Sequence, residues 1–135
     1  MSPLRYRTLA HTADVRLVVW GDDERALLAN AIAGTIALAL GRRTRGDIQR
    51  WAAIAPWPHD ARQRLVAAVN EALYQLYGHR AVAVDLRLKS GRAWLGLADL
   101  PSHRRLRVEI KAATFHDLAL EHWEGRLRAV LTLDL

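Results

Sequence analysis

Hydrophobic residues recur along the chain with two different periods, and the longer period predicts two helices. The first helix is expected from about residue 24 to residue 40, where apolar side chains repeat every four residues. Acidic residues at its start can cap the first turn, and Gly41 marks its end. The second helix is expected from Asp60, which forms a capping-box pattern with Gln63, to Gly78. The core-facing positions are Leu28, Ile32, Ile36 and Leu40 in the first helix and Val66, Val69, Leu73 and Leu76 in the second.

Alternation of apolar and polar residues predicts strands in most of the remaining chain. Pro56 and Pro58 interrupt one short strand, and the turn from Trp123 to Arg126 has the composition of a hairpin. Two helices, with strands concentrated in the second half, predict an α+β fold in which a mostly antiparallel mixed sheet packs with the helices. At 135 residues the chain is expected to form one domain, residues 1–135. The other strands are predicted over residues 5–9, 15–20, 82–88, 92–97, 106–112, 116–123 and 127–133.

Composition narrows the class of protein. Hydrophobic residues make up 51% and charged residues 25%, as in ordinary globular proteins. The lack of cysteine excludes disulfides, thiolate zinc sites and thiol nucleophiles. The amino terminus lacks the apolar run of a signal peptide, and the most apolar window, residues 26–40, is too short to span a bilayer. A cytoplasmic monomer without membrane contact is therefore expected.

The charge of the chain permits a nucleic-acid partner but does not identify one. The net charge is +6 and the isoelectric point is near 10.7. The arginines are scattered, with short clusters only at residues 42–45 and 104–105. Tryptophans and tyrosines fall mostly inside periodic segments, so we do not expect them to follow an exposed basic face. Basic charge can still help the protein approach RNA, or a partner that holds RNA.

The segment EIKAATFH, residues 109–116, carries one of only two lysines among 20 basic residues. Lysine provides a compact ammonium whose pKa shifts readily, whereas arginine provides a fixed planar fork, so the two do not substitute for each other at a site. Lys111 stands two residues after Glu109 and five before His116. The simpler alternative is chance, because most charged residues on strands face water.

Two aspartates are candidates for metal binding. Asp14 directly precedes a strongly predicted strand, and Asp134 directly follows the last one. If the strands at the two ends of the chain are neighbours, these carboxylates and that of Leu135 can converge. Such oxygen donors suit a hard divalent cation such as Ca²⁺, Mg²⁺ or Mn²⁺. In the alternative, Asp14 closes an Asx-turn and Asp134 is a solvated tail residue.

Other signs of catalysis are missing from the sequence. No two of the six histidines have the i, i+4 spacing of a zinc protease; His11 and His116 are the better candidates, with a structural hydrogen-bonding role as the alternative. There is no glycine-rich nucleotide fingerprint, Walker loop or nucleophile elbow. A binding or accessory domain is therefore favoured over an independent catalyst.

Four blocks follow one another along nearly the whole chain: HTADVRLVVWG, LVAAVNEALYQL with Glu71, EIKAATFH and the carboxy-terminal AVLTLDL. Together and in this order, they resemble the archease family. Two departures are present: Phe115 replaces the tyrosine that is usual in EIKAATFH, and the loop over residues 96–105 is shortened, with Leu97 where a glutamate is common. These departures concern partner contacts more than the aspartates and the lysine.

The resemblance implies an accessory protein of the RtcB-type RNA ligase, with no catalysis of its own. Such a protein promotes guanylylation of the ligase from GTP and its multiple turnover in tRNA splicing and RNA repair, and RNA is met indirectly through the ligase. Carried over, the divalent metal ion would be held by Asp14, Asp134 and an oxygen of Leu135, with Lys111 as the functional lysine. His11, Glu109 and His116 would support this site. A basic RNA-binding module and a metal-dependent phosphohydrolase are the alternatives.

Overall fold

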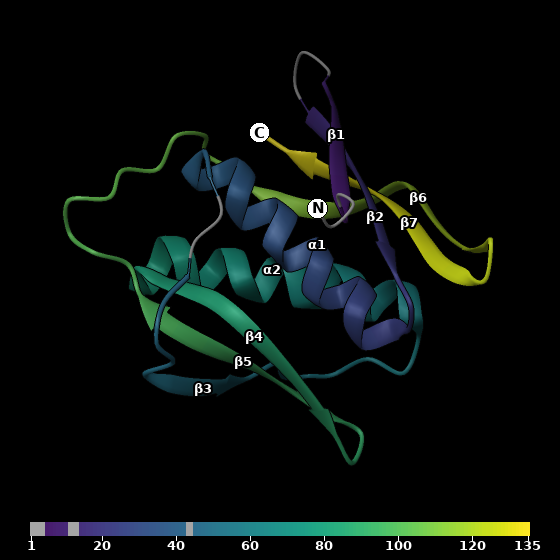
Figure 1. Ribbon diagram of the computed structural model, residues 1–135, viewed down its shortest axis with the longest axis horizontal. Coiled ribbons are helices and arrows are strands. Elements are labelled where there is room, and N and C mark those ends of the chain that lie inside the picture. Colours follow the sequence, from purple (N-terminus) through teal and green to yellow (C-terminus); the bar gives the residue numbers. More distant parts are fainter. Residues whose placement is uncertain (1–4, 11–13, 43–44) are drawn as a thin grey trace.

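The computed structural model describes residues 5–10, 14–42 and 45–135, and within them two antiparallel sheets enclose a layer of two helices (Figure 1). One sheet has the strand order β1-β2-β7-β6 and the other the order β3-β5-β4. The helices are α1 (Glu24–Leu40) and α2 (Ala61–His79). The strands are β1 (Tyr6–Ala10), β2 (Asp14–Gly21), β3 (Arg50–Ala53), β4 (Ala81–Lys89), β5 (Arg92–Asp99), β6 (Ala112–Trp123) and β7 (Arg126–Asp134).

Helix α1 is apolar on nearly every side because it packs against both sheets and against α2. The Asp23 side chain caps its start by accepting a hydrogen bond of 2.8 Å from the backbone N–H of Ala26. Gly41, with a φ of 79°, ends it in the left-handed conformation. The predicted helix and both of its ends are confirmed.

Helix α2 begins as its sequence predicts but ends later. The Asp60 side chain accepts a 3.1 Å hydrogen bond from the backbone N–H of Gln63, which confirms the cap. The predicted stop at Gly78 is wrong by a short step: the helix continues to His79, and Arg80 takes the left-handed cap conformation. The backbone N–H of Arg80 bonds to the carbonyl of Gln75, so a non-glycine residue closes this end.

The pairing of β2 with β7 brings the second strand and the last strand together in the middle of the four-stranded sheet. Alternate residues on these strands are buried against the helices, including Leu17 opposite Leu131 and Val15 opposite Leu133. Strands β7 and β6 form a hairpin whose turn residues Glu124 and Gly125 have φ values of 49° and 78°. Both values are those of a two-residue type I′ turn, so the predicted hairpin is confirmed.

The predicted strand over residues 106–112 is wrong. In its place, residues 106–111 run without regular structure, and one strand, β6, continues from Ala112 to Trp123. The alternating pattern is misleading here because the backbone of the segment bonds to a helix end: the N–H groups of Arg107 and Val108 both donate to the carbonyl of Ala39. The α+β class is confirmed, with its antiparallel strands divided between two sheets.

Replacing Gly21 by alanine is expected to lower the free energy of unfolding by roughly 1–3 kcal/mol, as overpacking does. A Cβ at this position would lie 2.2 Å from the backbone nitrogen of Leu27, because the end of β2 packs closely against the first turns of α1. Urea unfolding followed by circular dichroism measures the change. Gly78→Ala is the control, because its Cβ meets only the Tyr74 ring, at 3.6 Å, and we expect it to be neutral or stabilising by up to about 1 kcal/mol. Equal stability of the two variants would contradict this packing.

Candidate functional site

The pairing of β2 with β7 brings the two predicted metal-binding aspartates together. Asp14 lies directly opposite Asp134, and Ala112 of β6 lies opposite Asp134 on its other side. The next residues inward, Val15 and Leu133, are buried against the helices, so the aspartate side chains lie on the outer face of the sheet. Asp134 is exposed and Asp14 is partly exposed. The two strands are therefore neighbours, as the sequence left conditional, and the two aspartates lie opposite each other.

Lys111 joins this pair through its backbone. Its N–H donates a 2.8 Å hydrogen bond to the carbonyl oxygen of Asp134, immediately before β6 begins at Ala112. The Lys111 side chain is exposed, whereas its neighbour Ile110 is only 1% exposed and anchors the chain in the core. The backbone of Lys111 is thus fixed beside Asp134, and its ammonium lies on an exposed side chain.

Helix α2 holds the segment on both sides of Lys111. The side-chain amide of Asn70 donates to the carbonyl of Ala113 at 3.1 Å and accepts from its N–H at 2.7 Å, as a neighbouring strand would. The hydroxyl of Tyr77 accepts from the N–H of Ile110 at 2.7 Å and donates to the carbonyl of Val108 at 3.1 Å. Because β6 is an edge strand, these side chains satisfy backbone groups that no further strand pairs with.

Neither Asn70 nor Tyr77 was predicted from the sequence to position this segment. Asn70 and Tyr77 are seven residues apart, which places them on one face of α2, beside the apolar stripe that contains Val69 and Leu76. Two hydrogen-bonding side chains at that spacing, at the margin of a core face, are a usable signal. Their partner could not be known, because the strand that they contact was predicted with the wrong limits.

The other residues that the resemblance assigns to this site and that the structure describes lie close to Lys111 or Asp134 in the sequence. His116 lies in the irregular part of β6, with its Nε2 3.2 Å from Oδ2 of Asp117 and its carbonyl accepting a 2.9 Å hydrogen bond from Thr132. Glu109 is exposed, two residues before Lys111, and Leu135 follows Asp134 and packs partly against the core. His11 lies outside the described residues.

The carboxylate oxygens of this site could supply only part of the coordination shell of a hard cation. Asp14 and Asp134 carry carboxylates on facing strands, and an oxygen donor from Leu135, the next residue in the chain, stays a prediction. Within the part of the chain that the structure describes, no group of three or more histidine, aspartate and glutamate side chains is arranged to hold a metal. Water or a partner would have to complete the coordination, and metal binding stays a prediction.

Glu71, which occupies the family's acidic position in the second helix, lies in a different network. Its carboxylate accepts a 3.2 Å hydrogen bond from Gln75, whose side-chain oxygen accepts a 2.8 Å hydrogen bond from Arg50 of β3. These contacts tie α2 to the three-stranded sheet. We therefore assign Glu71 a structural role.

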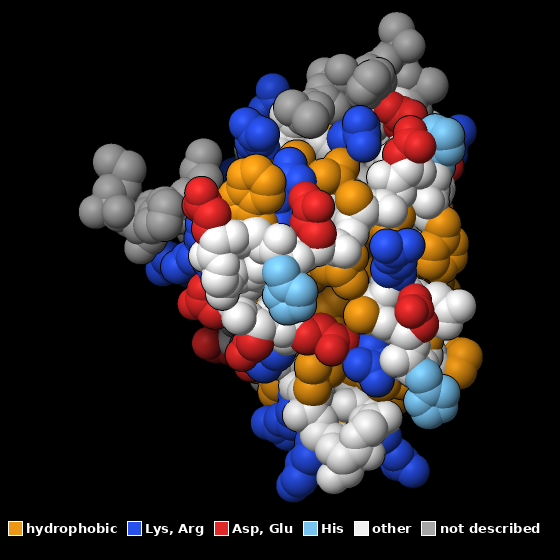
Figure 2. Space-filling view, turned by 90° about the vertical axis from the view of Figure 1, so that its right-hand side faces the viewer, with side chains coloured by type: hydrophobic (Ala, Val, Ile, Leu, Met, Phe, Trp, Pro, Cys, Tyr) orange, Lys and Arg blue, Asp and Glu red, His pale blue; other side chains and the backbone are white. Residues whose placement is uncertain are grey.

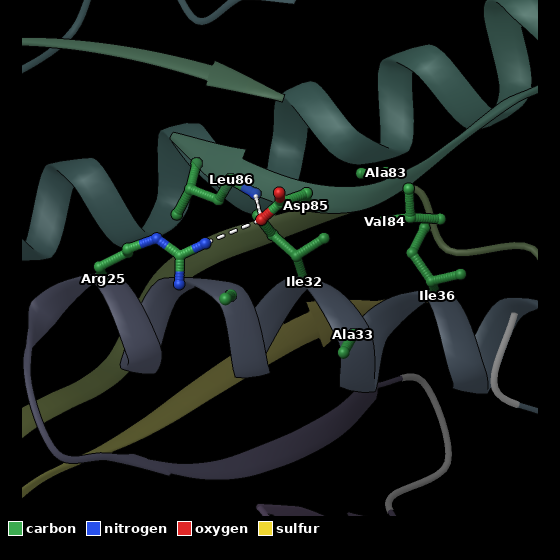
Figure 3. Close-up of a pocket in the computed structure, with 9 residues that line it drawn as sticks. Arg25, Ile32, Ala33, Ile36, Ala83, Val84, Asp85 and Leu86 are labelled. Atoms are coloured by element: carbon green, nitrogen blue, oxygen red, sulfur yellow. Dashed lines mark hydrogen bonds and ion pairs between the residues drawn. The ribbon is translucent and has the colours of Figure 1, made fainter. Parts of the chain in front are cut away.

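A small pocket of about 190 Å³ lies between α1 and β4, away from the aspartates and the lysine (Figure 3). Its walls are mainly apolar side chains such as Ile32 and Leu86, and one end is closed by an ion pair of 2.8 Å between Arg25 and Asp85. Asp85 also accepts a hydrogen bond from the backbone N–H of Leu86, next to an irregularity in β4. None of the residues predicted from the sequence to be functional lines this pocket.

Charge on the surface is mixed. On the side of the molecule shown in Figure 2, basic and acidic side chains are interspersed with hydrophobic ones. This agrees with the scattered arginines of the sequence. Neither helix in the described part of the chain has the length and hydrophobicity needed to span a bilayer.

Comparison with known proteins gives a family for this arrangement. The profile of the Archease protein family (MTH1598/TM1083) matches residues 6–135. The chain belongs to the archease family. Comparison with curated protein sequences gives no significant match.

Two solved structures are similar to this archease. The solution structure of protein 1598 from Methanobacterium thermoautotrophicum is 19% identical, covers 98% of this chain and 100% of that chain, and has a TM-score of 0.73. The crystal structure of an archease from Thermotoga maritima, described as a possible chaperone, is 17% identical, covers 96% of both chains and has a TM-score of 0.67. At these identities the likeness shows the fold.

Removing the Tyr77 hydroxyl with Tyr77→Phe is expected to lower the free energy of unfolding by about 1–3 kcal/mol, because the N–H of buried Ile110 loses its partner. Urea unfolding measures the loss, and amide hydrogen exchange at Ile110 should become faster. Tyr74→Phe is the matched control, because the Tyr74 side chain is 58% exposed and its hydroxyl contacts only exposed His79 among the described residues. Equal effects of the two changes would show that Tyr77 does not hold this segment.

Tyr77 is also expected to make the free energy of unfolding fall at high pH. Burial raises the pKa of its hydroxyl, the hydrogen bond from Ile110 opposes that rise, and the charge of Glu109 adds to it. Above about pH 10 the unfolded chain therefore loses this proton before the folded protein does, so the free energy of unfolding should fall as pH increases. Urea unfolding between about pH 9 and about pH 11 should show a smaller decline for Tyr77→Phe than for wild type. Identical slopes would contradict the assignment.

Proposed function

We propose that this archease promotes the GTP-dependent guanylylation and the multiple turnover of an RtcB-type RNA ligase in the cytoplasm, during tRNA splicing and RNA repair. The observation that carries the proposal is the meeting of Asp14, Asp134 and Lys111 at one end of the four-stranded sheet. Membership of the archease family supports an accessory role, and the description of the Thermotoga relative as a possible chaperone is compatible with one.

The chemistry of these side chains suits a nucleoside triphosphate. A divalent cation held by Asp14, Asp134 and an oxygen of Leu135 would supply positive charge to phosphate oxygens. The Lys111 ammonium is a mobile point charge with three donors, and it can contact the same phosphate oxygens or a carboxylate of the ligase. Phosphoryl and nucleotidyl transfer depend mainly on such positioning and charge stabilisation. The attacking nucleophile would belong to the ligase.

Rigidity of the support is part of the proposal. Asn70 and Tyr77 fix the backbone on either side of Lys111, and the carbonyl of Asp134 fixes Lys111 itself. A functional group that is held in place loses less conformational entropy when it meets its partner. Glu109 and His116 are exposed near this segment, where they can contact the ligase directly. His11 would support the same site.

Lys111→Ala is expected to reduce the stimulation of ligase guanylylation by roughly 10- to 100-fold, the loss typical of one hydrogen bond to a charged group. The assay mixes purified archease with its cognate ligase, GTP and Mn²⁺ or Mg²⁺, and quantifies covalent guanylate on the ligase. Lys89→Ala is a matched control, because Lys89 is the other lysine and lies exposed on β4, in the opposite sheet.

The metal arm of the same experiment varies the cation concentration. Asp14→Asn and Asp134→Asn should require more cation for half-maximal stimulation, because each removes a carboxylate charge. Stimulation that is unchanged in Lys111→Ala, or no stimulation by the wild type, would overturn the proposal.

A further inference from the structure

The outer face of the four-stranded sheet carries a row of arginines and tryptophans, which we call the arginine–tryptophan face: Arg7, Arg16, Trp20, Trp123 and Arg128. Both helices pack on the other side of this sheet. Residues opposite each other on antiparallel strands share a face, and Leu17, Val19 and Leu131 point to the helices. The alternate positions therefore face outward, and three of them, Val18, Val130 and Thr132, are nevertheless buried.

The row crosses all four strands. The guanidinium of Arg7 in β1 lies 5.9 Å from the centre of the Trp20 ring in β2. Trp20 lies opposite Arg128 of β7, whose guanidinium lies 5.4 Å from the centre of the Trp123 ring in β6. Arginine and tryptophan thus alternate across the sheet. Trp20 and Trp123 lie on strands, as their periodic segments predict, but each is also beside an arginine, which the sequence does not predict.

Arg16 places positive charge between Trp20 and Asp14 on β2. It lies on the same face of β2, two residues from Asp14 and four from Trp20, opposite Thr132. Its Nε is buried without a hydrogen-bond partner, and among the described residues no ion pair neutralises its guanidinium. A positively charged side chain left unpaired in this way favours an anion from outside the chain.

We propose that the arginine–tryptophan face binds single-stranded RNA directly. Bases stack on exposed aromatic rings and on guanidinium planes, and arginine forks match phosphate oxygens, so the alternation fits both parts of a nucleotide chain. Trp123 is 47% exposed and Trp20 partly exposed, so unpaired bases can reach both rings. The proposal goes beyond stimulation of a ligase, because it gives RNA a site on this chain.

The position of this face relates it to the aspartates. Along β2, Trp20 and Asp14 are six residues apart, which corresponds to about 20 Å. Asp14, Arg16 and Trp20 share the outward side of that strand. An RNA strand lying along it would therefore lead from the tryptophans to Asp14, Asp134 and Lys111.

A purely structural role for the stacks is the competing explanation. Arg87 and Trp51 form a similar stack on the outer face of the three-stranded sheet, with the guanidinium 4.2 Å from the ring centre. Trp94 of β5 lies opposite Arg87 on the same face, so arginine and tryptophan meet there as well. This stack supplies a matched control, since Arg87→Ala removes the same charge and the same kind of contact.

The test measures fluorescence anisotropy of a labelled, unstructured RNA of about 12 nucleotides, a length within the range of single-strand sites, without ligase. Wild type should bind, and affinity should fall steeply with salt. Trp123→Ala should weaken binding roughly 5- to 100-fold through lost stacking. Arg16→Ala should weaken binding and lower the slope of log affinity against log salt by about 0.7. Arg87→Ala should leave affinity and slope unchanged.

Circular dichroism confirms that each variant is folded, and Trp20→Phe, which keeps an aromatic ring, should retain most of the binding. No RNA binding by the wild type at low salt would overturn the inference. So would an equal loss in Arg87→Ala and Arg16→Ala, because binding would then follow net charge alone. Guanylylation of the ligase is measured separately, without RNA. Stimulation of the ligase with no RNA binding would contradict this inference alone. RNA binding with no stimulation would contradict the proposed function alone.

Discussion

The antiparallel pairing of β2 with β7 is the interaction on which both the fold and the candidate site depend. It places the second strand beside the last one in the middle of one sheet, with β1 and β6 at the two edges. Its inward side chains, among them Leu17 and Leu131, are fully buried against the helices. Because side chains alternate along a strand, burying these residues forces Asp14 and Asp134 outward and opposite each other. A shift of one residue in the register would exchange the two faces, so core packing fixes the geometry of the site.

The helix layer adds the second constraint. Helix α2 faces the core with its apolar stripe, and at the margin of that stripe Asn70 and Tyr77 reach the backbone that carries Lys111. Two kinds of interaction therefore position one lysine: apolar burial of Ile110 on one side, and side-chain hydrogen bonds to otherwise unpaired backbone on the other. The residues nearest the site belong to elements far apart in the sequence, which is why a three-layer fold is needed to form it.

The sequence predicted what depends on local period and capping, and less of what depends on tertiary contact. The Asp23 and Asp60 regions, the apolar period of both helices and the hairpin turn at Gly125 are local signals, and each is confirmed. Residues 106–111 alternate in the same way as a strand, yet their backbone bonds to Ala39 and Tyr77, partners that no local pattern contains. The division into two sheets has the same origin, because only the packing of the helices between them separates the strands.

For the candidate site, the sequence identified the aspartates and the lysine but not the residues that position them. Asp14 and Asp134 stood out because each borders a predicted strand, and the resemblance to archeases joined them to Lys111. Asn70 and Tyr77 bond to backbone groups more than 30 residues away in the sequence, so only the three-dimensional structure shows their role. Trp20 illustrates the same limit: alternation predicts that it shares a face with Arg16, but not that Arg7 and Arg128 lie beside it from other strands.

The outer face of the four-stranded sheet thus has two chemical zones. Asp14 and Asp134 place negative charge at one end, where a cation or the ammonium of Lys111 can balance it. Toward the hairpin the face turns basic and aromatic, and among the described residues Glu121 forms an ion pair of 2.9 Å with one of its arginines, Arg128. An anionic polymer would be attracted to the basic zone and repelled by bare carboxylates, unless a cation neutralised them. Occupancy of the acidic zone would then govern how far along the face a nucleic-acid strand can lie, which links the two zones through electrostatics alone.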